Sequence, residues 1–104
     1  MSVDLDPVTA GLRALAEPSR REIVRLLARE ELCVCHLVDD LGVDQSLVSH
    51  HLRVLREAGL VESDRFRYWT YYRLVPGVLS AMAGELAAMA EQAPSAGERR
   101  RACC

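Results

Sequence analysis

The sequence lacks any apolar run of the roughly 20 residues that a membrane-spanning helix needs. Its first six residues carry two acids and no basic residue, which is unlike a signal peptide. These absences predict a cytoplasmic protein with no membrane partner. Because cytoplasmic thiols stay reduced, the four cysteines are expected to act as ligands or reactive groups rather than as disulfides.

Lysine is also absent, so every fixed side-chain cation is an arginine. The formal net charge is −2, which gives no overall basic signal for nucleic acid. The charge is nevertheless uneven along the chain. Between Ser46 and Arg73 five arginines stand against three acids, together with His50 and His51.

Apolar periodicity and helix-ending residues predict five helices in 104 residues, a length that suits one domain. Pro18 suits the first turn of the second helix, and Gly42 ends the third. Asp44 is the expected N-cap of the fourth helix, and Gly59 ends it. The predicted helices span residues 6–15, 18–29, 33–41, 45–58 and 78–93.

Two segments rich in β-branched and aromatic residues, 60–63 and 68–74, predict a β-hairpin whose polar connection is 64–67. Its alternating aromatic side chains are expected to pack within the sheet rather than to stack on single-stranded nucleic acid. From Pro94 onward the residues are small, polar and basic. The sequence therefore predicts a domain at 1–93 and a flexible tail at 94–104 that ends in Cys103 and Cys104.

Two short helices joined through Gly42, with a hairpin after them, predict a mainly α, winged helix-turn-helix fold. Four stretches carry a close resemblance to the ArsR/SmtB family of metal-sensing transcriptional repressors: "LAEPSRREIVRLL" (15–27), "ELCVCHL" (31–37), "DQSLVSHHLRVLREAGLV" (44–61) and "YYRL" (71–74). The resemblance covers about residues 8–93. It implies a homodimer that needs no cofactor to bind double-stranded operator DNA and leaves it when a metal or metalloid binds.

The chain departs from the family pattern in three places. The family hairpin often has a glycine at its turn, and this turn has none. Val38 stands where the arsenic-sensing branch often has a third cysteine. The zinc-sensing branch has Asp, His and Glu ligands on its last helix, where this chain offers only Glu85 and Glu91.

The fourth helix is the expected recognition helix, because polar side chains that can pair with bases or phosphates lie at its start. His51 points about 100° away from His50, so it is expected to face the protein. Two arginines near the wing tip are expected to reach phosphate or the minor groove. The candidate DNA contacts are Gln45, Ser46, Ser49, His50, Arg53, Arg65 and Arg67. The run at 99–101 either solubilises the tail or adds phosphate contacts.

Apolar residues on the last helix recur at spacings of three, four and three, which is the pattern of a helix packed on another helix. A two-fold dimer also suits a protein that reads two half-sites. The predicted homodimer therefore forms through the first and last helices. The candidate interface residues are Leu12, Leu79, Met82, Leu86 and Met89.

The cysteines occur as two tight pairs, Cys33 with Cys35 and Cys103 with Cys104, outside the predicted core stripes. Thiolates select thiophilic ions. As(III) is the expected inducer, with Sb(III), Cd(II), Pb(II) and Zn(II) as alternatives, and His36 is either a further donor or simply exposed. Because positions i and i+2 of a helix lie about 200° apart, Cys33 and Cys35 are expected to bind one ion only if the helix start unwinds.

Two other interpretations remain open from the sequence. The same fold can act as a redox sensor that closes a disulfide. A small thiol oxidoreductase or arsenate reductase is the alternative from another class. An enzyme of that kind needs an α/β scaffold and a low-pKa cysteine at a helix N-terminus. The sequence shows no βαβ pattern and no phosphate-binding loop, so we expect a non-enzyme.

Overall fold

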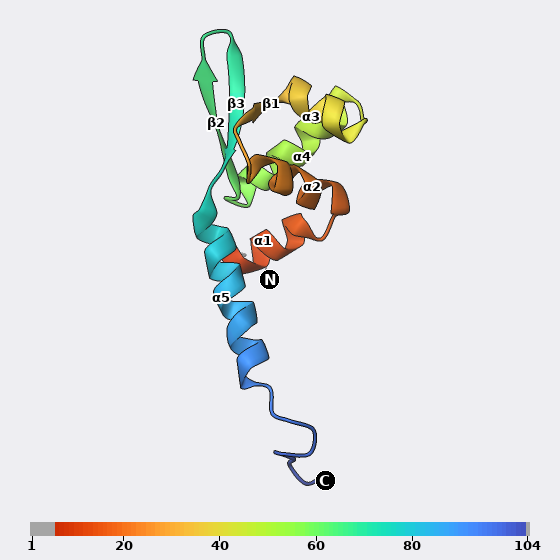
Figure 1. Ribbon diagram of the computed structural model, residues 1–104, viewed down its shortest axis with the longest axis vertical. Coiled ribbons are helices and arrows are strands. Elements are labelled where there is room, and N and C mark those ends of the chain that lie inside the picture. Colours follow the sequence, from red (N-terminus) through yellow and green to blue (C-terminus); the bar gives the residue numbers. More distant parts are fainter. Residues whose placement is uncertain (1–5, 104) are drawn as a thin grey trace, which may run out of the picture.

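The computed structural model describes residues 6–103 and contains five helices and three strands within that range (Figure 1). None of these helices combines the length and the apolar character needed to cross a membrane. The helices are α1 (Pro7–Leu15), α2 (Pro18–Leu27), α3 (Val34–Leu41), α4 (Gln45–Glu57) and α5 (Pro76–Gln92), and the strands are β1 (Leu32–Cys33), β2 (Val61–Phe66) and β3 (Trp69–Leu74).

The starts of α1 and α4 are fixed by local carboxylate caps, and the sequence predicts the one at α4. The carboxylate of Asp6 accepts a hydrogen bond from the backbone N–H of Thr9 at 2.8 Å. Asp44 does the same for the N–H of Leu47 at 2.8 Å, which begins α4 at the expected residue. Gly42 ends α3 with a φ of 68°, a left-handed conformation that glycine adopts without a steric cost. The turn between α3 and α4 is therefore encoded locally.

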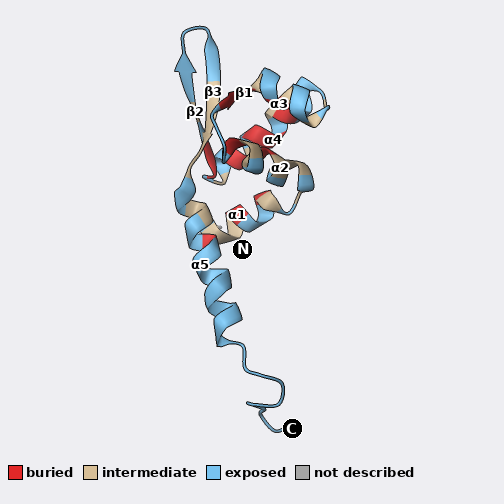
Figure 2. Cartoon of the chain, viewed as in Figure 1, coloured by how far each residue is buried: buried red, intermediate tan, exposed pale blue. Residues whose placement is uncertain are grey.

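The core lies where α2, α3 and α4 meet the base of the hairpin (Figure 2). Its most deeply buried members are apolar and at most 2% exposed, and burial of such side chains stabilises the fold by about 1.5–3 kcal/mol each. They include Ile23, Leu37, Val48, Leu52, Leu55, Leu60 and Val61. The close packing of α3 on α4 gives the helix-turn-helix its fixed geometry, and the hairpin completes a winged helix.

The hairpin is longer, and its connection shorter, than the sequence predicts. Strand β2 continues to Phe66, which pairs with Trp69, so only Arg67 and Tyr68 form the turn. The expected connection at 64–67 is thus wrong. Arg73 pairs with the carboxylates of both Glu62 and Asp64, and this ion pairing holds acidic residues in the strand despite their poor intrinsic preference for it.

A short strand that the sequence did not reveal joins the hairpin. Strand β1 pairs antiparallel with β3, with Leu32 opposite Tyr72 and Cys33 opposite Tyr71. The sheet order is β1-β3-β2. As a result, the residue that starts the cysteine motif is hydrogen-bonded into the same sheet as the wing.

Helix α5 leaves the core as an arm, and the described molecule measures 63 × 33 × 23 Å (Figures 1 and 2). Near its start α5 packs against α1, and Met82 is 5% exposed there. Beyond Met82 every residue of α5 is exposed. Residues 93–103 are exposed and contain no helix or strand, while Cys104 lies outside the described residues.

Candidate functional site

The thiols of Cys33 and Cys35 already lie together, with their Sγ atoms 2.9 Å apart. Cys33 is the last residue of β1 and the N-cap of α3, with an extended backbone (φ −94°, ψ 169°) rather than a helical one. The expectation that both cysteines lie in the helix, and that the helix must unwind, is therefore wrong. Because only Cys35 is helical, the usual 200° separation does not apply, and the pair is pre-formed.

His36 completes a compact cluster with the two thiols. Its Nδ1 atom accepts a hydrogen bond from the backbone N–H of Cys33 at 3.2 Å and lies 3.3 Å from the Cys33 Sγ. The ligand atoms of Cys33, Cys35 and His36 all lie within 4.8 Å of one another. His36 is exposed, as one of the two expectations had it, and its Nδ1 atom also takes part in the helix cap.

The cluster has the dimensions of a soft-ion site. Two thiolates on one tetrahedral zinc, with Zn–S bonds of about 2.3 Å, stand about 3.7 Å apart. The Sγ atoms must separate by roughly 0.8 Å to reach that spacing. Cys35 is exposed and can supply this movement by rotation of its side chain, whereas Cys33 is buried and only 7% exposed. The donor set, two sulfurs and one imidazole nitrogen, suits thiophilic and borderline ions.

Electrostatics make the two thiols unequal. Burial alone raises the pKa of the Cys33 thiol, but the hydrogen bond from Cys35 and nearby backbone N–H groups outweigh burial and lower it below its ordinary value. The same thiol–thiol hydrogen bond, together with desolvation and the negative charge of Cys33, raises the pKa of Cys35. Cys33 is therefore the thiol of the pair that ionises first, with Cys35 as the hydrogen-bond donor to its thiolate.

Cys103, the tail cysteine that the structure describes, does not join this cluster. Among residues 6–103, the one group of three metal-capable side chains is Cys33, Cys35 and His36. Cys103 is exposed at the end of the chain segment that follows α5, on the opposite end of the molecule from β1 and α3 (Figure 1). Cys104 lies outside the described residues. A role for either thiol stays a prediction.

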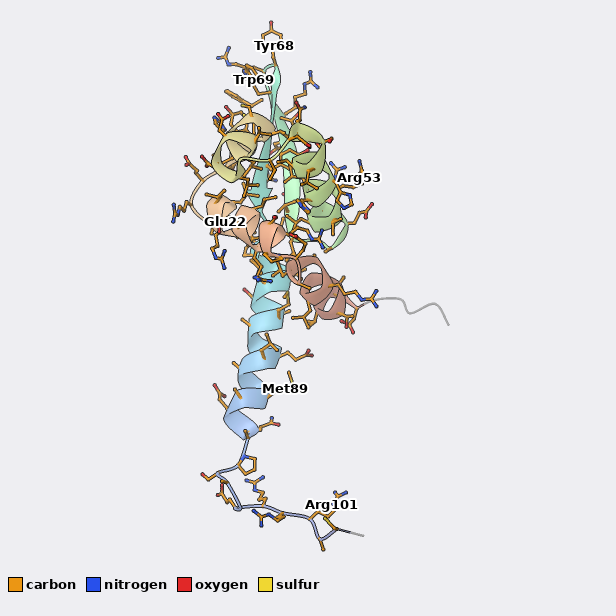
Figure 3. The ribbon with its side chains drawn as sticks, turned by 90° about the vertical axis from the view of Figure 1, so that its right-hand side faces the viewer. Glu22, Arg53, Tyr68, Trp69, Met89 and Arg101 are labelled. Carbon is orange, nitrogen blue, oxygen red and sulfur yellow. The ribbon has the colours of Figure 1, made fainter. Side chains whose placement is uncertain are left out.

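A hollow of about 310 Å³ lies beside the cluster and is also lined by the candidate recognition helix α4 and by the wing. One wall is formed by Cys33, Val34 and Cys35, and the others by Gln45 at the start of α4 and by residues 68–70 of the wing. Figure 3 shows Tyr68 and Trp69 at the tip of the hairpin. They are 89% and 56% exposed, so the expectation that the wing aromatics pack within the sheet is wrong for these two. The reason is that the hairpin tip projects beyond the helices that would cover it. Tyr71 and Tyr72 are half-buried, and Tyr72 packs against the core.

The candidate DNA contacts lie on two neighbouring surfaces. On α4, Ser49 is half-buried and the other polar candidates, Gln45, Ser46, His50 and Arg53, are exposed; Figure 3 shows Arg53 directed away from the body of the protein. The hydroxyl of Ser46 donates to the Asp44 carboxylate at 2.9 Å, so it also supports the N-cap. His51 is 5% exposed, which confirms that it faces the protein.

The two wing arginines differ from each other. Arg65 lies within β2, opposite Thr70, rather than in the turn. Arg67 is in the turn with a φ of 58°, and its guanidinium lies 5.4 Å from the centre of the Phe66 ring. Arg67 thus takes the left-handed position for which glycine is usual, and a cation–π contact holds its side chain.

The candidate dimer residues divide into one that is buried within the protomer and others that are half-buried or exposed. Met82 is buried within the protomer against Gly11 of α1, so its assignment to the interface alone is wrong: it belongs to the core. Leu79 is half-buried, whereas Leu12, Leu86 and Met89 are 41%, 46% and 56% exposed. Figure 3 shows Met89 on the exposed arm. An apolar face therefore continues along α5 beyond the protomer core.

These features define a winged helix-turn-helix protein with a thiol cluster at its first motif helix. The sequence profile described as "Bacterial regulatory protein, arsR family" matches residues 17–63. The arsenical resistance operon repressor of Bacillus subtilis is 40% identical over 73 residues, which cover 65% of this chain and 70% of that protein. The arsenic resistance transcriptional regulator ArsR1 of Pseudomonas putida is 46% identical over 67 residues.

Structural comparison agrees with the sequence matches. The solution structure of a homodimeric winged helix-turn-helix DNA-binding domain from Mycobacterium bovis, described as a possible ArsR-family transcriptional regulator, has a TM-score of 0.67 and 26% identity. The similarity covers 96% of this chain and 100% of that one. The chain belongs to the arsR family of bacterial regulatory proteins. The resemblance and the fold class are confirmed, and the thiol-enzyme alternative is set aside.

The family match does not extend over the whole of every relative. The Pseudomonas protein is matched over 64% of this chain and 52% of its own length. The chain thus spans about half the length of several relatives that it matches. The ions that those proteins bind therefore support only a proposal about this chain. Which ion this chain binds must be argued from its own thiols.

Proposed function

We propose that the protein is a dimeric transcriptional repressor that leaves its operator when a thiophilic ion, foremost As(III), binds Cys33 and Cys35. The observation that carries the proposal is the position of the thiol pair. Cys33 belongs both to β1, which pairs with the wing, and to the N-cap of α3, which packs on α4. An ion bound there acts on both DNA-reading elements at once. Reduced thiols suit a cytoplasmic location.

The binding step has a defined mechanical effect. The Sγ atoms must separate from 2.9 Å to the wider spacing of two ligands on one ion. Cys35 makes this movement from the first turn of α3, and the bound ion then ties that turn to Cys33 at the end of β1. If the shift lowers DNA affinity a hundredfold, the ion and DNA are coupled by about 2.7 kcal/mol. DNA must then weaken ion binding by the same factor.

The number of sulfurs bears on which ion is the inducer. As(III) bound by sulfur takes three donors, and two are present in the cluster. We propose that Cys103 or Cys104, from the same or the partner protomer, supplies the third. The ten residues from 93 to 103 have a flexible reach of about 17–19 Å and an extended reach of about 33–36 Å. Sb(III) would likewise need a third sulfur, whereas the two sulfurs and His36 can bind Cd(II), Pb(II) and Zn(II).

A titration of the reduced protein tests the proposal. As(III), Cd(II) and Zn(II) are added in turn while thiolate charge-transfer absorbance and release of a labelled DNA fragment from upstream of the gene are followed together. Trp69, the single tryptophan, lines the same hollow as the thiols, so its fluorescence provides a third signal. All three signals should share one midpoint for the inducer.

Matched variants separate the parts of the proposal. Cys33→Ser and Cys35→Ser should retain DNA binding and lose release, because each removes a ligand without touching α4. Ser49→Ala with His50→Ala should weaken DNA binding and leave the thiol titration unchanged. Release of DNA by As(III) that persists in both cysteine variants would overturn the site, and a wild-type protein that retains no DNA would overturn the function.

The same geometry favours one second candidate, a redox-sensing repressor. The Cys33 thiol has a lowered pKa and lies 2.9 Å from the Sγ of Cys35, which is exposed to solvent. A hydroperoxide can oxidise the pair to a disulfide: two electrons and two protons leave the thiols, and the hydroperoxide is reduced to an alcohol and water. Release of DNA by hydroperoxide in metal-free buffer, reversed by dithiothreitol, would identify this function.

A further inference from the structure

Arg20 connects two helices that the proposed function assigns to different tasks. Its Nε donates to the backbone carbonyl of Ala14, in the last turn of α1, at 2.6 Å. Its Nη1 lies 3.2 Å from Nδ1 of His51, which is on α4. Helix α1 packs against α5, and α4 carries the candidate DNA contacts. One guanidinium therefore spans the proposed dimer framework and the proposed recognition helix.

The contact fixes the state of His51. A guanidinium can only donate hydrogen bonds, so Nδ1 of His51 must be the acceptor, and the imidazole is neutral with its proton on Nε2. His51 is 5% exposed, and its burial lowers its pKa below the ordinary value, an effect that the charges of Arg20 and His50 increase and that of Glu17 opposes. Protonated His51 would lose its acceptor and face a cation.

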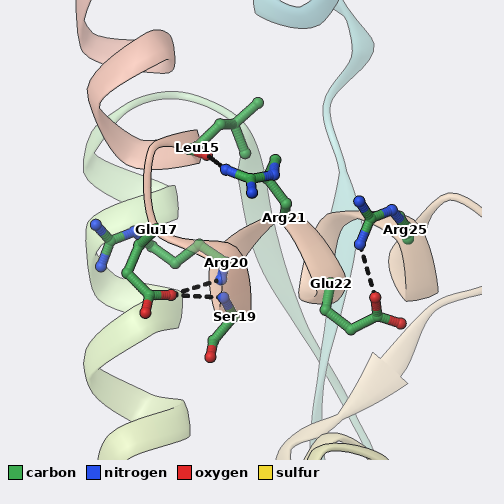
Figure 4. A network of polar contacts seen from close by, with 7 residues as sticks. All are labelled: Leu15, Glu17, Ser19, Arg20, Arg21, Glu22 and Arg25. Carbon is green, nitrogen blue, oxygen red and sulfur yellow. Dashed lines mark hydrogen bonds and ion pairs between the residues drawn. The ribbon is translucent and has the colours of Figure 1, made fainter.

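Glu17 holds the base of this link. Its carboxylate accepts hydrogen bonds from the backbone N–H groups of Ser19 at 2.6 Å and of Arg20 at 3.2 Å, and so fixes the first turn of α2 (Figure 4). The backbone of Arg20 is anchored there, at the start of α2. Glu17 thus holds the backbone end of Arg20, while the Ala14 carbonyl and the His51 ring hold its guanidinium.

The next residue provides an internal comparison. Arg21 donates from Nη1 to the carbonyl of Leu15 at 2.5 Å, so it also caps the last turn of α1 (Figure 4). It is exposed, and among residues 6–103 its one side-chain hydrogen bond is this cap. Arg20 and Arg21 thus share the capping of α1, and only Arg20 bonds to α4.

We propose that Arg20 and His51 are positioning residues that fix the angle of the recognition helix relative to α1, and thereby the separation of the two recognition helices in the dimer. This inference rests on the proposed DNA-binding function. A dimer reads half-sites about 34–36 Å apart, so the orientation of α4 decides whether both helices enter the major groove together. Neither residue needs to contact DNA.

Paired variants test the link. Arg20→Met removes the bonds to both α1 and α4, whereas Arg21→Met removes only a cap of α1. We expect Arg20→Met to weaken DNA binding about tenfold, the effect of losing the charge-assisted hydrogen bond to His51 on α4, with the dimer intact. We expect Arg21→Met to stay within about twofold of wild type. The DNA is the fragment that wild type protects in footprinting.

The dependence of DNA affinity on the spacing between half-sites is a readout that a merely structural role of Arg20 would not change. DNA fragments with one base pair added or removed between the half-sites should bind wild type much more weakly than the natural fragment does. Arg20→Met should discriminate less among the three fragments, because its recognition helices are held less firmly. Equal losses in Arg20→Met and Arg21→Met, with unchanged discrimination, would overturn the inference and leave the proposed function standing.

His51 gives a second route if Arg20→Met folds poorly. Asparagine places an amide oxygen near the position of Nδ1, so His51→Asn should keep DNA affinity within about twofold of wild type, while His51→Leu should resemble Arg20→Met. Because the pKa of His51 lies below its ordinary value of 6.5, wild type should lose affinity relative to His51→Asn only as the pH falls from 6.5 through that lowered pKa. Imidazole ¹⁵N shifts should show the Nε2–H form of His51 without any DNA; an Nδ1–H form would overturn the link itself.

Discussion

Gly11 of α1 and Met82 of α5 meet so closely that a side chain at position 11 has no room. A Cβ built on Gly11 would lie 2.5 Å from the Met82 sulfur and 3.0 Å from a Val78 methyl group. Gly11 is buried, and α1 and α5 touch through this contact. The glycine therefore sets the distance between the helix that meets Arg20 and the helix that forms the arm.

Gly11→Ala should destabilise the protein. The added methyl group forces Met82 and Val78 to move, at a cost of about 1–3 kcal/mol, which exceeds the gain of about 1 kcal/mol in helix propensity. Gly84→Ala is the matched control, because nothing lies within 4 Å of a Cβ there. It should stabilise the protein by up to about 1 kcal/mol. Urea unfolding monitored by circular dichroism measures both, and a stabilised Gly11→Ala would refute the packing argument.

Leu86→Glu should produce a folded monomer that binds DNA weakly. Leu86 is 46% exposed in the protomer, so the substitution spares the core, while a charge in the proposed dimer seam lacks a partner and costs about 3–5 kcal/mol. Ala87→Glu adds the same charge beside the seam and should remain dimeric. Met82→Glu should instead lower the melting temperature. Sedimentation that shows a dimer for Leu86→Glu would place the interface elsewhere.

Replacement of both Cys103 and Cys104 by serine should weaken As(III) binding and lower the sulfur coordination number from three to two. X-ray absorption at the arsenic edge measures that number directly. Affinity for Cd(II) should change less, because Cys33, Cys35 and His36 supply three donors without the tail. Three sulfurs and full DNA release in the tail variant would remove the tail from the site.

His36→Ala should separate the candidate ions. The imidazole is a good donor to Zn(II) and Cd(II), so their affinities should fall by at least about tenfold. As(III) uses sulfur, and its affinity should stay within a few-fold of wild type. Competition against a chromophoric chelator measures the divalent ions, and charge-transfer absorbance measures As(III). Equal losses for all ions would mean that His36 acts through the helix cap alone.

Arg65→Ala with Arg67→Ala should weaken DNA binding and reduce its salt dependence by about 1–2 units in the slope of log K against log salt, since each phosphate contact releases about one counterion. Arg29→Ala with Arg56→Ala removes the same charge from positions outside the proposed interface. That control should change the slope much less. Identical slopes for the two double variants would assign the effect to net charge rather than to the wing.

The parts of the fold that depend on neighbours in sequence were predictable. Asp44 and Gly42 place the ends of α3 and α4 correctly, because a cap needs only residues three or four positions away. The buried stripe of α4 was also predictable from its 3.6-residue period. His51 followed from the same geometry, since it stands about 100° from His50.

The parts of the fold that depend on contacts between distant segments could not be predicted from the sequence. Strand β1 exists because Cys33 pairs with Tyr71, nearly 40 residues later, and two residues give no periodic signal of their own. The thiol geometry depends on that pairing, so it was missed as well. The exposure of Trp69 follows from the length of the hairpin relative to the helices beneath it. Arg20 gave no signal, because its bond to His51 joins residues 31 positions apart.

If the protein is the dimeric repressor proposed above, the exposed arm of α5 makes operator occupancy depend on how much protein the cell contains. A single protomer leaves the apolar face of this helix in water, and the proposed operator needs two protomers at once. While monomers predominate, occupancy rises with the square of the protomer concentration. A repressor that also controls its own gene would then restore its level more steeply than a monomeric one, so the arm influences the response time of the circuit as well as the shape of the protein.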